Sequence, residues 1–134
     1  MTTVFVDANV FLRFFTVDHA GQHEKAAALF EAAAAGRIRL VTGPPVLFEI
    51  AWTLRSAYHL SQEQTLDALE AMLAFKGLKL SDADLVEEAV RLARSSDQEF
   101  ADAYIGASAQ AWGAEIATFN KKHFRKMGAG LHQF

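Results

Sequence analysis

The sequence predicts an α/β fold, an α/β/α sandwich around a mostly parallel sheet of four to five strands, formed by residues 1–134 as one domain. Two observations support this prediction. Short apolar runs alternate with longer stretches of helical period along the chain, as in folds built from β-α units. The chain of 134 residues has no internal repeat and no Pro-, Gly- or Ser-rich linker, and this length suits a single domain.

The elements follow in order from periodicity and from their boundary residues. Gly36 follows an alanine-rich helix, Pro44 and Pro45 lie where a helix would open, and Ser61 and Gln64 have the spacing of a capping box. Strands are expected at Thr3–Val6, Ile38–Thr42, Leu78–Leu80 and Glu115–Thr118, with a last one at Leu131–Phe134. Helices are expected at Asn9–Phe15, Gln22–Ala35, Pro45–His59, Gln62–Phe75, Asp82–Arg94 and Phe100–Trp112.

Composition excludes several classes of site. The chain contains no cysteine, which rules out disulfides and thiolate metal sites and is compatible with a cytoplasmic location. Its N-terminal stretch lacks the basic n-region of a signal peptide, and its longest run without charged residues, 103–114, is too short to cross a bilayer. The net charge of −3 is not typical of a nucleic-acid binder, but residues 120–126 are basic and contain no acid.

Polar residues are expected at the carboxyl edge of the sheet, where parallel α/β folds bind ligands. Asp7 ends the first expected strand and is followed by Asn9; Thr118 and Asn120 close the "IATFN" run. Each has an ordinary alternative explanation, since Asp is a favoured helix N-cap and Asn a common turn residue.

Two further acids stand in apolar or small-residue helices. Glu49 lies in "PPVLFEIAWTL" with no cation three or four residues away, which favours a pocket edge over a solvated helix face. Asp102 lies near the start of "ADAYIGASAQAW" and shares a helix face with Glu99. Acids in a first turn are also favoured by the helix dipole alone.

Together these residues predict a metal site. Clustered carboxylates repel one another unless a cation neutralises them. Oxygen ligands without His or Cys suit Mg²⁺ or Mn²⁺ rather than Zn²⁺, and such an ion can activate water for attack on a phosphodiester.

The motifs "VDANV", "FE" in an apolar helix, "FADAYIGASA" and "ATFNKKHF" resemble those of PIN-domain ribonucleases, most closely the VapC-type toxins of toxin–antitoxin pairs. The likeness runs from Thr3 to about Phe124. It implies a metal-dependent endoribonuclease with tRNA or mRNA as substrate, a VapB-type antitoxin as partner, and often a homodimer.

Carried onto this chain, the resemblance implies that Asp7, Glu49 and Asp102 are catalytic and hold Mg²⁺ or Mn²⁺. The fourth family position, Asp or Asn, falls on Asn120. Because the site then has three acids and not four, the number of bound metal ions, one or two, stays open. Glu99 is a candidate for supplying the missing negative charge. Thr118 would orient a ligand, a water or the substrate phosphate, and Asn9 would orient Asp7. The candidate RNA contacts are Arg13, Lys121, Lys122, Arg125 and Lys126.

Two other functions are compatible with the sequence. One is a phosphatase or phosphoacceptor domain of the haloacid-dehalogenase type, which needs a second Asp close to Asp7 where the chain has Asn9, and which leaves Glu49 unexplained. The other is an inactive PIN fold that binds protein or RNA. Its partner surfaces would be the apolar stretches 11–15 and 46–52, which would equally serve a dimer or an antitoxin.

Overall fold

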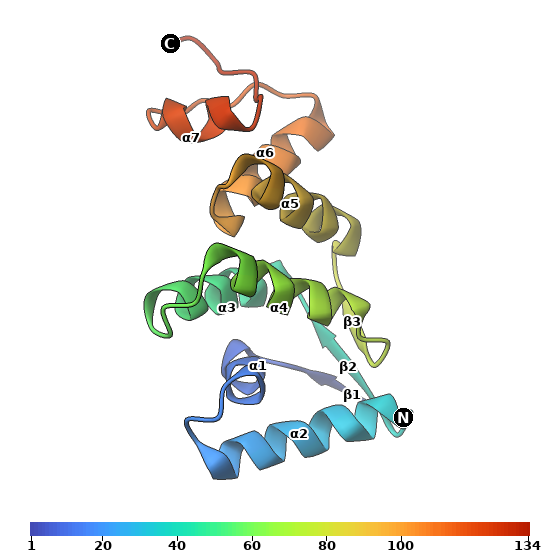
Figure 1. Cartoon of the computed structure of the whole chain (residues 1–134). Coiled ribbons are helices and arrows are strands. Elements are labelled where there is room, and N and C mark those ends of the chain that lie inside the picture. The colour runs from blue at the N-terminus through green and yellow to red at the C-terminus, as the bar shows by residue number, and fades with distance from the viewer. The chain divides into compact units, whose positions relative to one another are not determined.

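The structure is a computed structural model that describes residues 1–134. The chain folds into two compact units, Met1–Asp82 (unit 1) and Ala83–Phe134 (unit 2). Figure 1 draws unit 1 from blue to yellow-green and unit 2 from there to red. No helix is long and apolar enough to cross a membrane.

Unit 1 contains the sheet. Its three strands are all parallel and lie in the order β1-β2-β3. A pair of helices connects each strand to the next, which is the arrangement that the alternating sequence pattern predicts (Figure 1). The elements are β1 (Thr2–Phe5), α1 (Ala8–Phe15), α2 (Ala20–Ala34), β2 (Ile38–Thr42), α3 (Pro44–Ser56), α4 (Gln62–Ala74) and β3 (Leu78–Leu80).

One face of this sheet is buried and the other is exposed. Leu40 is paired with Val4 on one side and with Leu78 on the other, so these three side chains share a face, on which Leu40 and Leu78 are buried. Phe5 and Lys79 belong to the opposite face and are exposed. Right-handed crossovers in a sheet of this order carry both helix pairs to the same side. The second helical layer of the expected sandwich is therefore not part of unit 1.

Buried polar contacts fix the carboxyl ends of the first two strands. The hydroxyl of Thr42, which is 2% exposed, donates to the carbonyl oxygen of Val6 at 2.9 Å. The backbone amide of Val6 donates to the carbonyl oxygen of Val41, also at 2.9 Å. Because Val6 is held in this way, the position of Asp7 follows directly from the sheet.

Unit 2 is helical. Its elements are α5 (Ala83–Ser96), α6 (Phe100–Trp112) and α7 (Lys121–Lys126). Small side chains allow α5 and α6 to pack closely: Ala89, Ala93, Ala103 and Ala107 are all buried. Gly106 on α6 faces Leu92 and Met127, and a Cβ there would lie 2.9 Å from the Met127 sulfur. The short helix α7 is anchored by buried Phe124.

The sheet has three strands, so the prediction of four to five was wrong. Residues 115–118 and 131–134 do not form strands and meet only at one isolated parallel bridge, between Ile116 and Leu131. Both stretches are too short and too exposed to extend into a ladder, since Ile116 is the one buried residue in the first and the second has none. The prediction also missed α7, whose basic sequence has no apolar period apart from Phe124.

Candidate active site

Asp7 lies two residues after the end of β1 and caps α1. Its Oδ1 accepts a hydrogen bond of 2.7 Å from the backbone amide of Ala8. Its other oxygen, Oδ2, has no protein partner and the side chain is exposed. Capping and ligand binding are therefore compatible, because each uses a different oxygen. The hydrogen bond expected from Asn9 to Asp7 is not formed; Asn9 instead lines a hollow on α1 and α2.

Glu49 lies on the solvent-facing stripe of α3, which also carries Pro45, Trp52 and Ser56. These positions recur every three to four residues, the spacing of one helix face. The opposite stripe, with Leu47, Ile50 and Leu54, is buried. The structure therefore favours the solvated helix face over the pocket edge for Glu49. The carboxylate is accessible to a ligand from solvent.

Three predicted or neighbouring polar side chains come together in unit 2. The Nδ1 atom of His123 lies 3.1 Å from Oδ2 of Asp102 and 3.2 Å from Nδ2 of Asn120. Asp102 is held in the first turn of α6, and Asn120 and His123 belong to the first turn of α7. The packing of α7 on α6 thus brings two of the expected site residues together around one imidazole.

His123 is the residue that sequence reasoning missed in this cluster. His123 follows Asn120 by three residues, a spacing that makes two side chains neighbours on a helix, but no helix was predicted at α7. Its contact with Asp102 spans 21 positions of sequence and depends on tertiary packing. The ionised carboxylate of Asp102 can only accept a hydrogen bond, so Nδ1 of His123 has to donate in this contact. We therefore assign a hydrogen on Nδ1 of His123 to the contact with Asp102.

Thr118 and Glu99 have local structural roles. The hydroxyl of Thr118 accepts a hydrogen bond of 2.9 Å from the backbone amide of Asn120, which fixes the turn that leads into α7. Glu99 occupies the N-cap position of α6, three residues before Asp102. Both residues thus lie beside the cluster of Asp102, Asn120 and His123 in sequence.

The basic run forms an exposed helix. Lys121, Lys122, Arg125 and Lys126 of α7 are all exposed, and none takes part in a salt bridge within the chain. These four cations are therefore available to a ligand with negative charge.

Arg13 differs from the basic residues of α7, because its guanidinium already has partners. Nε donates to Gln22 at 2.7 Å, one terminal nitrogen donates to the Tyr58 hydroxyl at 3.2 Å, and Asp18 lies 3.7 Å away. The Tyr58 hydroxyl donates to Asp18 at 2.8 Å, and this hydrogen bond is the main reason why the pKa of Asp18 is lowered. An RNA contact at Arg13 would compete with this network.

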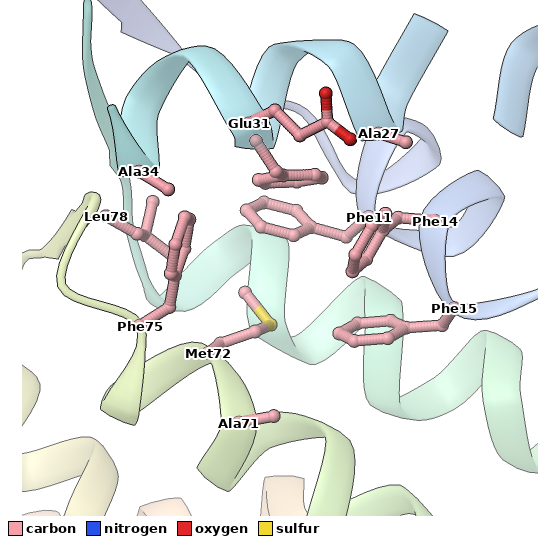
Figure 2. A pocket seen from close by; sticks show the side chains of 11 residues that line it. Phe11, Phe14, Phe15, Ala27, Glu31, Ala34, Ala71, Met72, Phe75 and Leu78 are labelled. Atoms are coloured by element: carbon pink, nitrogen blue, oxygen red, sulfur yellow. The ribbon is translucent and has the colours of Figure 1, made fainter. Parts of the chain in front are cut away.

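Two of the hollows in unit 1 involve the candidate residues or aromatic side chains. One, of about 380 Å³, is lined by Asn9, Arg13, Gln22 and Lys25 together with apolar side chains. The other, of about 400 Å³, is almost entirely apolar: Figure 2 shows Phe11, Phe14 and Phe15 of α1 facing Met72 and Phe75, with Glu31 as the one charged lining residue. We call this second hollow the aromatic hollow.

The expected ligands are divided between the units: Asp7 and Glu49 belong to unit 1 and Asp102 to unit 2. Within neither unit do three His, Asp or Glu side chains gather closely enough to hold a metal ion by themselves. The donor set nevertheless suits a hard divalent cation, since carboxylate and amide oxygens are what Mg²⁺ and Mn²⁺ prefer. Asp102 contacts His123 through Oδ2 alone, so its Oδ1 is free to bind a ligand. In Asp7 the free oxygen is Oδ2, because Oδ1 caps α1.

Comparison with known families identifies one match. The PIN-domain model matches residues 4–130, which span both units. No curated protein matches the chain. PIN domains are generally nucleases and typically use a divalent metal. Since the match covers nearly the whole chain and runs through Asp7, Glu49, Asp102 and Asn120, the chain belongs to the PIN-domain family.

Proposed function

We propose that the protein is a metal-dependent endoribonuclease that hydrolyses RNA phosphodiester bonds. The observation that carries the proposal is the family match across residues 4–130. The motif resemblance supports it, since it assigns the site to Asp7, Glu49, Asp102 and Asn120. The chain thus belongs to a family whose members are generally nucleases, and its carboxylates and amide offer the oxygen ligands that a divalent metal prefers.

The roles follow from the chemistry of the side chains. Asp7, Glu49 and Asp102 would hold Mg²⁺ or Mn²⁺, with Asn120 as an additional oxygen ligand or a partner of a bound water. When bound, such an ion supplies a Lewis acid that lowers the pKa of water and neutralises charge developing on the phosphate. His123 orients Asp102 and Asn120 through Nδ1, in the way that outer-shell partners orient metal ligands.

The basic residues of α7 would bind the phosphates of the substrate. Lys121, Lys122, Arg125 and Lys126 are exposed and follow Asn120 directly, so phosphates bound there would lie next to the reacting bond. Contacts of this kind position a nucleic acid without reading its sequence. They support RNA in general, with tRNA and mRNA as the classes that the resemblance suggests.

We further propose that the protein is the toxin of a toxin–antitoxin pair, working in the cytoplasm as a homodimer. The aromatic hollow supports a protein partner, because its lining is apolar and Phe14 is 40% exposed. An antitoxin segment with apolar side chains would cover it. The motif resemblance to VapC-type toxins supports this identity.

The test is cleavage of total RNA and of tRNA by purified protein that is free of bound inhibitor. We expect cleavage with Mg²⁺ or Mn²⁺, none with EDTA, and a loss of at least about 100-fold in Asp102→Asn, as for removal of groups that stabilise a transition state. Asp84→Asn is the matched control, since Asp84 occupies the first turn of α5 as Asp102 does that of α6. Absence of cleavage with either metal would point to a binding module instead.

A further inference from the structure

Two phenyl rings stack on the surface of unit 2, next to the candidate site. The ring centroids of Phe119 and Phe134 are 4.9 Å apart and the planes are inclined by only 13°. Phe119 is 90% exposed and Phe134 is 76% exposed. The pair is thus ordered by its own contact and contributes almost nothing to the core. Phe119 immediately precedes Asn120, the fourth family position.

The backbone explains why the two rings meet. Ile116 is bridged in parallel with Leu131. The amide of Ile116 donates to the carbonyl oxygen of Gly130 at 2.8 Å, and the amide of His132 donates to that of Ile116 at 2.9 Å. Phe119 and Phe134 each lie three residues beyond a bridge partner, so the bridge brings the two short segments that carry them close together.

A second contact holds Phe134 from the side. The His132 ring meets Phe134 edge to face, with centroids 5.8 Å apart, and Nδ1 of His132 lies 3.1 Å from Oε1 of Glu115. Glu115 is the acid in this cluster. The phenyl pair is therefore positioned by the bridge, by its own stacking and by a buttressing imidazole.

Charge indicates what such a surface would bind. The exposed cations of α7 begin at Lys121, two residues after Phe119, and no acid lies within residues 119–126. Sites that bind single-stranded nucleic acid combine aromatic rings, on which bases stack, with cations that follow the backbone. An apolar protein partner would not be matched by four adjacent unpaired cations.

We propose that Phe119 and Phe134 form a stacking platform for an unpaired base of the RNA substrate, while α7 binds the adjoining phosphates. This inference rests on the proposed function and adds to it that the substrate is bound as a single strand beside Asn120. A base that stacks on Phe119 would extend the existing pair of rings. The phosphate attached to that nucleotide would then meet the exposed cations of Lys121 and Lys122.

The test separates bases from phosphates in the absence of divalent metal. Fluorescence anisotropy in EDTA would measure the affinity of the protein for fluorescein-labelled octauridylate and for an abasic ribose-phosphate oligomer of equal length. We expect Phe119→Ala and Phe134→Ala each to weaken octauridylate binding by about tenfold and to leave binding of the abasic oligomer unchanged. Phe119→Trp should retain or improve the affinity. Lys122→Ala should weaken both oligomers alike.

The matched control is Trp112→Ala, because Trp112 is 86% exposed and lies in the same unit but outside the platform. Folding of each variant is checked by circular dichroism. Equal affinity of wild type and Phe119→Ala for octauridylate would overturn the proposal, as would an equal loss on the abasic oligomer. A change in self-association by light scattering without a change in RNA affinity would mean that the rings form a protein contact, which also overturns it.

Failure of the platform and failure of the nuclease give different results. If the wild type cleaves RNA with metal but Phe119→Ala binds octauridylate normally, the platform is wrong and the nuclease stands. If the wild type binds octauridylate through Phe119 but never cleaves RNA, the platform stands and the enzymatic proposal fails. Absence of binding to both oligomers at low salt would overturn the platform.

Discussion

At the scale of single residues, His123 is the side chain whose role depends most on its neighbours. Its Nδ1 contacts Asp102 and Asn120 at once, so loss of the imidazole would release both from their orientation. Outer-shell partners of metal ligands typically contribute 10- to 100-fold in metal affinity or activity.

We therefore expect His123→Ala to weaken Mn²⁺ binding by about tenfold or more, measured by isothermal titration calorimetry. His123→Asn should restore much of the affinity, because its amide nitrogen can occupy the place of Nδ1 and donate to Asp102. His59→Asn, which changes an exposed histidine in unit 1, serves as the control. Unchanged Mn²⁺ affinity in His123→Ala would show that the imidazole does not position the ligands.

At the scale of elements, the entry to β3 depends on a glycine. A Cβ added to Gly77 would lie 2.8 Å from the Phe75 ring and 3.0 and 3.1 Å from atoms of Ala33, one of them backbone. The loop between α4 and β3 therefore packs so closely against α2 that an added Cβ would force its neighbours to shift. The carbonyl oxygen of Gly77 also accepts from the amide of Leu40, so a shift of the loop would disturb the pairing of β2 with β3.

Gly77→Ala is expected to reduce the free energy of unfolding by about 1–3 kcal/mol, the usual cost of overpacking. Gly21→Ala is the matched control, because no atom lies within 4 Å of the position of its added Cβ. Since Gly21 lies in α2, alanine there should leave stability unchanged or raise it by up to about 1 kcal/mol. Urea denaturation of both variants, followed by circular dichroism, would test this. Equal midpoints would mean that α2 and the loop adjust without strain.

Element prediction from sequence succeeded where local rules decide the structure. The Ser61–Gln64 capping box is formed in both directions, and β2, β3 and α6 have the predicted bounds. It failed where tertiary contacts decide. Residues 115–118 read as a strand because they are apolar, but they find only Leu131 as a bridge partner. Helix α7 is anchored by the burial of Phe124, and the sequence around Phe124 has no apolar periodicity that would predict a helix.

The candidate site likewise contains residues whose positions local sequence predicts and residues whose positions depend on tertiary packing. The places of Asp7 beside a strand end and of Asp102 in a first helical turn could be predicted, and their role as metal ligands stays a prediction. Those positions follow from local sequence. His123 could not, because its partner Asp102 is distant in sequence and belongs to another helix. Glu49 was placed correctly on α3, but its face could not be read from a helix that is apolar on nearly all sides.

At the scale of the whole molecule, the proposed function assigns ligands from both units to one metal ion. A ligand that binds only the folded chain stabilises it by about 2.7 kcal/mol at a concentration 100 times its dissociation constant. If Asp7 of unit 1 and Asp102 of unit 2 ligate the same ion, either residue alone should be insufficient for this stabilisation. Their substitutions would then be strongly non-additive, as for residues that act through one shared partner.

We expect Mn²⁺ to raise the melting temperature of the wild type and to raise it little in Asp7→Asn, in Asp102→Asn or in the double variant, measured by differential scanning calorimetry. Glu24→Gln, which removes an exposed acid of α2, should keep the full rise and so exclude a general charge effect. Independent partial losses that add up in the double variant would instead mean two separate cation sites. A rise that survives in Asp7→Asn but not in Asp102→Asn would assign the ion to unit 2 alone, and Asp7 would then serve only as the N-cap of α1.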